Sequence, residues 1–168
     1  MIFTVMPEDW NYYQRILVNA SKAVLLRFYE KHPNEKLIAI GYVFELWNLS
    51  PQFDLCGNIG ACHSEPHEVR WNSGDYRFPA GLLNIVDELG TEWTQITQRL
   101  HQAAEGQDRS GEVYRGLIEI SCGALVDLSR SGLFEDSARL DFNVSEVDDS
   151  WEVVVARNRT IHEQLTKA

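Results

Sequence analysis

Residues 37–46 read LIAIGYVFEL, and this stretch decides the fold class. Large side chains stand at every second position and alternate with smaller ones such as Ala39 and Gly41. A period of two, with β-branched and aromatic residues on one face, predicts a long β-strand. The large side chains are Ile38, Ile40, Tyr42, Phe44 and Leu46.

Helical patterns flank this strand on both sides. Residues 7–32 carry apolar side chains three and four positions apart, which predicts a helix that Pro33 ends. After a turn, Phe53 and Leu55 begin a second apolar stretch, which predicts a hairpin partner for the first strand. The further predicted elements are helices over 82–89, 93–104 and 111–131, a half-exposed strand over 140–145, and a helix or a strand over 151–166.

The order of these elements predicts an α+β fold, with a central antiparallel or mixed sheet covered by helices. A chain of 168 residues fits one domain, so we expect residues 1–168 to form a single α+β domain. Hydrophobic residues make up 44 % of the chain and five tryptophans are present, which excludes disorder as the main state.

Charge and cysteine content narrow the class of protein. A net charge of −10 argues against a general nucleic-acid binder, whose affinity depends on lysine and arginine. No apolar run approaches the ~20 residues that cross a bilayer, and no secretory signal pattern precedes residue 7. Three cysteines do not form a disulfide framework. We therefore expect a cytoplasmic protein with reduced cysteines.

The negative charge is concentrated in residues 135–152. This stretch holds seven acidic residues against Arg139, a net charge of −6. It is either the solvated face of a polar strand and turn or a surface that steers a basic partner. In the second interpretation, the partner-binding residues are Asp141, Glu146, Asp148 and Asp149.

A second candidate surface is the aromatic segment of residues 69–78. Trp71, Asp75 and Tyr76 lie there among arginine and turn-forming residues, a composition typical of protein interfaces. The two aromatic side chains would serve equally well as lids that close the core. Both interpretations stay open.

One cluster has the ligand types of a zinc site. Cys62, His63 and His67 follow Cys56 within a short stretch, so a metal-dependent or other hydrolase is an alternative function. The spacing lacks the pair of cysteines that zinc fingers use, and buried cysteines commonly act as small apolar residues. The favoured prediction is therefore that the chain holds no metal.

Other catalytic patterns are absent from the sequence. It contains no nucleophile elbow, no phosphate-binding loop and no dinucleotide-binding motif, so we expect no cofactor and no catalytic residue. Residues 141–152 place oxygen ligands at calcium-loop spacing, but Glu146 replaces the required glycine. The alternation around Phe142 favours a strand there instead.

Four segments in order carry a family resemblance. They are Leu37 to Leu46, Arg70-Trp71, Gly132-Leu133-Phe134, and Leu140 to Asp149. In this order the chain resembles a family of small bacterial proteins of unknown function found among immunity and toxin-neighbourhood proteins. The resemblance implies an α+β fold, no established catalytic residues, and binding of a partner toxin.

These observations together predict a non-catalytic, protein-binding module of immunity type. We expect it to occlude a basic partner such as a toxin, with acidic residues that mimic phosphate and with Trp71 and Tyr76 as apolar anchors. The alternatives are the hydrolase described above and a homo-oligomeric regulatory domain. In the latter, a strand edge or the last helix would pair across a two-fold axis.

Overall fold

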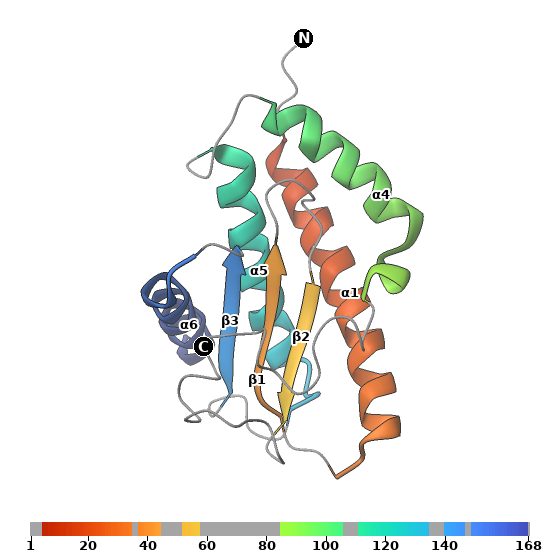
Figure 1. The fold of residues 1–168 in the computed structure, drawn as a ribbon, viewed down its shortest axis with the longest axis vertical. Helices are drawn as coiled ribbons and strands as arrows, with labels where there is room; N and C mark the ends of the chain where they lie inside the picture. Colours follow the sequence, from red (N-terminus) through yellow and green to blue (C-terminus); the bar gives the residue numbers. More distant parts are fainter. Residues whose placement is uncertain are drawn as a thin grey trace.

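The computed structural model describes residues 5–34, 37–44, 52–57, 85–105, 111–134, 140–146 and 149–167. These residues form four helices and three strands (Figure 1). In chain order they are α1 (Pro7–Lys31), β1 (Leu37–Phe44), β2 (Gln52–Gly57), α4 (Ile85–Ala104), α5 (Glu112–Arg130), β3 (Asp141–Glu146) and α6 (Trp151–Thr166).

The predicted strand is confirmed over residues 37–44 as β1, the middle strand of the sheet in the order β2-β1-β3, while residues 45 and 46 lie outside the described residues. The hairpin is confirmed as well, because β2 pairs with β1 in antiparallel fashion, with Ile40 opposite Leu55. On the other side β3 runs parallel to β1, with Tyr42 opposite Val144. The sheet is therefore mixed, and the antiparallel alternative is wrong.

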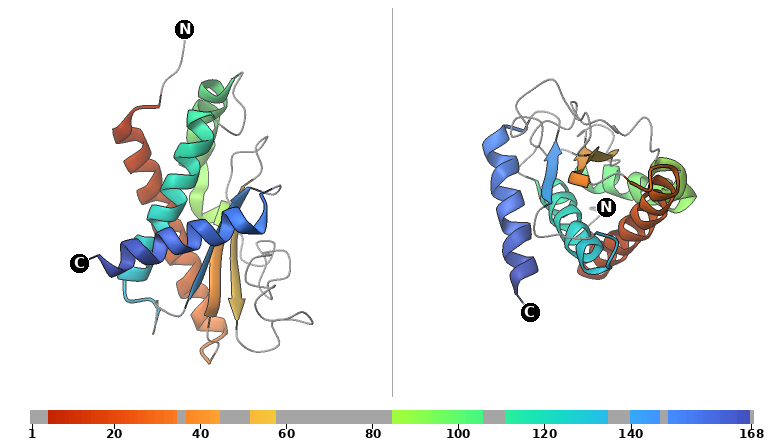
Figure 2. Two further views of the ribbon diagram at one scale, coloured as in Figure 1. Left: turned by 90° about the vertical axis from the view of Figure 1, so that its left-hand side faces the viewer. Right: turned by 90° about the horizontal axis from the view of Figure 1, so that it is seen from below.

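The α+β class is confirmed, but a central sheet is not. The sheet is small, and α1, α4 and α5 all lie on the same face of it, while α6 runs beside β3 (Figures 1 and 2). The two long helices α1 and α5 pack against each other as well as toward the sheet. The reason is their wide apolar stripes, which need helical partners in addition to three short strands.

Helix boundaries follow local signals. Proline at the first helical position needs no backbone donor, and the Met6 amide donates to Asp9 Oδ2 at 3.2 Å, so α1 begins at Pro7. In α4 the backbone bends at Gly90, which has φ 65° and joins the two predicted helical patterns. After α5, Gly132 adopts φ 80°, the left-handed conformation that ends the helix.

Residues 151–166, left open between helix and strand, form helix α6. Val154 and Ile161 are buried at a spacing of seven, whereas Val153 is 40 % exposed. A helical period places the first two side chains on one face and Val153 on another. None of the described helices combines the length and the apolar character that a membrane span requires.

Tyr42 of β1 places a hydroxyl group inside the core. Its oxygen lies 2.6 Å from Ser21 Oγ of α1, and its ring stacks on Phe53 with the centroids 5.2 Å apart. Ser21 uses its own proton to donate to the Leu17 carbonyl at 2.7 Å, so Tyr42 is the donor to Ser21. Burial raises the pKa of Tyr42 well above its usual value.

We expect alkaline pH to destabilise the wild-type chain more steeply than the Tyr42→Phe variant. Above about pH 10 the unfolded chain releases the Tyr42 proton while the folded chain keeps it, so the free energy of unfolding falls as pH rises. The slope from this one group is at most about 1.4 kcal/mol per pH unit. Urea denaturation of both proteins between about pH 9 and 11 measures it. Equal slopes would contradict the burial of this hydroxyl.

Candidate functional site

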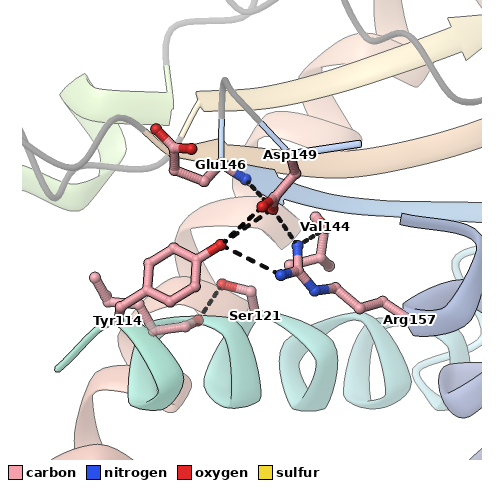
Figure 3. A network of polar contacts seen from close by, with 7 residues as sticks. Tyr114, Ser121, Val144, Glu146, Asp149 and Arg157 are labelled. Atoms are coloured by element: carbon pink, nitrogen blue, oxygen red, sulfur yellow. Dashed lines mark hydrogen bonds and ion pairs between the residues drawn. The ribbon is translucent and has the colours of Figure 1, made fainter. Parts of the chain in front are cut away.

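Three side chains from two helices and a turn meet at the end of β3 (Figure 3). Arg157 of α6 donates from Nη1 to Asp149 Oδ2 at 2.6 Å and from Nη2 to the Tyr114 hydroxyl at 3.3 Å. Tyr114 of α5 in turn donates to the two carboxylate oxygens of Asp149, at 3.2 and 3.1 Å. We call Tyr114, Asp149 and Arg157 the polar triad.

Backbone groups complete the triad. The Glu146 amide donates to Asp149 Oδ2 at 2.8 Å, and the Asp149 amide donates back to the Glu146 carbonyl at 2.9 Å. Arg157 Nη1 also donates to the Val144 carbonyl at 2.7 Å. The triad therefore ties the start of α6 to the end of β3, and it places a carboxylate just before the N-terminus of α6, where negative charge is favourable.

The triad is shielded from solvent, with side-chain exposures of 15 % for Arg157 and 10 % for Asp149. Burial raises the pKa of Tyr114, since the opposing effect of the Arg157 bond is smaller. Burial would lower the pKa of Arg157, but its bonds to Asp149 and Tyr114 outweigh this and raise it. Tyrosine thus stays neutral and arginine stays charged near pH 7. The arrangement suits a fixed ion pair and not proton transfer.

Of the predicted partner-binding residues, the structure describes Asp141, Glu146 and Asp149. None of these three side chains projects freely into water. Glu146 is only 2 % exposed, so the prediction of a surface position is wrong for it. Glu146 lies on the same face of β3 as Phe142 and Val144, which are also buried. Asp141 is half-buried, and Asp149 belongs to the triad.

The half-exposed strand predicted at 140–145 is also corrected. Asn143 is 1 % exposed and Ser145 is 8 % exposed, so the polar positions of β3 are buried along with the apolar ones. β3 is enclosed because β1 pairs with it on one side and α6 packs along it on the other. Residues 141–146 are extended, as the alternation predicted, and do not coil as a calcium loop would.

The remaining predicted site residues lie outside the described residues. They are the partner-binding residues Trp71, Asp75, Tyr76 and Asp148, and the alternative metal ligands Cys62, His63 and His67. Within the described ranges, no three histidine, cysteine or acidic side chains come together as metal ligands would. Cys122 of α5, which is described, is a buried free thiol, and burial raises its pKa to about 11.

Sequence reasoning missed Tyr114 and Arg157 as members of a site. Arg157 stands in the buried stripe of α6, three residues after Val154 and four before Ile161. A charged residue in such a stripe is a signal of a buried ion pair, since isolated charges are rarely buried. The sequence does not show which carboxylate pairs with Arg157, because residues 135–152 contain seven acidic residues.

Comparison of the whole chain with protein-family models, with curated proteins and with solved structures found no significant match. The resemblance to small immunity-type proteins therefore stays a prediction. The protein is therefore characterised by its own structure. A small mixed sheet is backed by three helices, and a polar triad ties α6 to β3.

Proposed function

We propose that this chain is a cytoplasmic, non-catalytic protein-binding module of immunity type, which occludes a basic partner such as a toxin. The observation that carries this proposal is the concentration of charge, with a net −6 in residues 135–152 out of −10 for the whole chain. Such a concentration accelerates the encounter with a basic surface by electrostatic steering.

The polar triad supports a division of labour within this acidic stretch. Arg157 neutralises Asp149, and Glu146 is buried, so we assign these two carboxylates a structural role and no contact with a partner. Glu152, in the first turn of α6, is exposed, and Asp148 adjoins Asp149 in the chain. We assign the partner-facing charge to Asp148 and Glu152.

Preorganisation gives the triad its part in this function. Asp149 holds the Glu146 amide and Arg157, so the end of β3 and the start of α6 lose little conformational entropy when a partner binds, and more of the interaction energy appears as affinity. In the proposal Trp71, Asp75 and Tyr76 add apolar and polar contacts at the rim. Their composition, with two aromatic side chains among charged neighbours, supports that role.

Charge reversal tests the proposal. We expect Asp148→Lys/Glu152→Lys to slow association with a captured basic partner about tenfold or more at low salt, with a smaller difference at high salt. The immobilised full chain first captures partners from a lysate of the source organism, with elution in steps of rising salt and identification by mass spectrometry. Association rates are then measured on the purified partner by surface plasmon resonance.

The matched control is Glu30→Lys/Glu163→Lys, which changes the net charge by the same amount at exposed positions of α1 and α6. The control should slow association less than the test variant, because its charges lie outside the acidic stretch, and the contrast should be clearest near 0.1 M salt, where the Debye length is about 10 Å. Equal slowing in both double variants, or capture of no basic protein, would contradict the proposal.

A further inference from the structure

The helix α1 lies at one side of the fold, opposite α6, and one of its faces is open to solvent (Figures 1 and 2). Its other face belongs to the core through buried residues such as Leu17, Val24 and Phe28. The solvent side carries residues at alternating spacings of four and three, and all of them are exposed or half-buried. We call these residues the outer seam of α1, and they are Tyr12, Ile16, Asn19, Ala23, Leu26 and Glu30.

Alternating spacings of four and three place side chains in a narrow stripe along a helix, as at the contact positions of a coiled coil. Tyr12 is 40 % exposed and Leu26 is 54 % exposed, and Ile16 and Ala23 lie half-buried between them. Single exposed apolar residues are common on protein surfaces, but here they repeat along several turns of one helix. The outer seam is therefore an apolar strip of the kind that a second helix covers.

The charge beside the outer seam is positive, although the whole chain is acidic. Residues 10–29 contain three basic residues and no acidic one, in a chain of net charge −10. Arg15 and Lys22 stand seven residues apart next to the seam, where a coiled coil carries the charges that choose its partner. Within the described part of the chain, no acidic side chain holds either of them. On the other flank, Arg27 pairs with Glu88 of α4, so that charge is already compensated.

We propose that the outer seam docks an acidic amphipathic helix of a partner protein. Apolar side chains of that helix cover Tyr12, Ile16 and Leu26, while its acidic side chains pair with Arg15 and Lys22. A second copy of this chain would instead bring two positive flanks together, and like charges oppose such pairing. The seam contains no residue of the acidic stretch 135–152, so the inference does not depend on the proposed function.

Synthetic peptides of three heptads, about 21 residues, test the proposal by nuclear magnetic resonance on the isotope-labelled full chain. The acidic amphipathic peptide carries leucine at its contact positions and glutamate beside them. One control peptide has lysine in place of glutamate, and the other keeps glutamate but has serine in place of leucine. We expect the acidic amphipathic peptide to shift the amide signals of Tyr12, Asn19 and Leu26, and to bind α1 at least about tenfold more tightly than either control.

Substitutions in the chain provide the second part of the test. Arg15→Glu/Lys22→Glu should weaken binding of the acidic amphipathic peptide about tenfold or more. The control Arg115→Glu/Arg159→Glu makes the same charge change at exposed positions of α5 and α6, and it should weaken binding less than about twofold. Leu26→Ser should also weaken binding, because it removes an apolar side chain that is 54 % exposed and therefore not needed for the core.

Helical circular dichroism checks that each variant is folded, and the changed side chains are all exposed or half-buried. Equal binding of the glutamate and lysine peptides at α1, or equal weakening in the two double variants, would overturn the proposal. Signal shifts confined to elements other than α1 would do the same. Self-association of the chain through α1 in the absence of peptide would make a second copy the occupant, and it would overturn the proposal as well.

Discussion

Arg157→Ala is expected to lower the free energy of unfolding by about 3 kcal/mol, the largest effect of any exchange in the polar triad. The substitution removes the cation from the Asp149 carboxylate, which is 10 % exposed, and it also removes the donor to the Val144 carbonyl. A shielded carboxylate without its cation retains the desolvation cost and loses the compensating attraction. Urea denaturation at pH 7 measures the loss.

The neighbouring Arg159→Ala is the control, because Arg159 is exposed on the same helix and should change stability by no more than about 0.5 kcal/mol. The double variant Arg157→Met/Asp149→Leu removes both charges. It should recover only part of the loss, because it avoids the unpaired charge but leaves the Glu146 amide without its acceptor and the Val144 carbonyl without its donor. A loss below about 1 kcal/mol in Arg157→Ala would mean that the pair behaves as an ordinary surface salt bridge.

Gly41→Ala is expected to be the most destabilising of three glycine substitutions, with a loss of about 3 kcal/mol or more. Gly41 of β1 lies opposite Asn143 of β3, and an added Cβ would overlap the Asn143 carbonyl oxygen. A backbone atom in a paired strand cannot move without breaking the ladder, so β1 and β3 would separate. Thermal and urea denaturation together measure the effect.

Two glycines of α5 complete this series. A Cβ at Gly116 would overlap the indole of Trp10, and one at Gly123 would overlap the flexible amide end of Gln14. Gly116→Ala should therefore cost about 1–3 kcal/mol, and Gly123→Ala less, because a flexible side chain can move aside and alanine favours the helix. Any other order of the three losses would contradict the close packing of α1, α5, β1 and β3.

Much of the secondary structure could be predicted because it depends on neighbouring residues. Alternation over 37–46 is a property of a strand whose one face is buried, and the stripe from Trp10 to Phe28 is a property of a helix. Residues 151–166 could not be decided from their valines alone. Val153 and Val154 suit a strand by propensity, and only the burial of Val154 and Ile161 against the rest of the fold favours the helix.

The candidate site was less predictable, since its members are distant in the chain. Tyr114 and Asp149 are 35 residues apart, and Tyr114 and Arg157 are 43 apart. A count of acidic residues locates the stretch that contains Asp149, but it treats the seven carboxylates alike. Glu146 and Glu152 have the same side chain, yet one is buried at the end of β3 and the other is exposed.

The sequence by itself determined the order of helices and strands up to residue 146, the α+β class and the place of the negative charge, because periodicity and charge are local properties. Only the tertiary structure decided that β3 runs parallel to β1, that α6 lies along its edge, and that Asp149 is neutralised by Arg157. These features depend on which distant surfaces meet. That choice is made by the total burial of apolar area and by the need to pair every buried polar group.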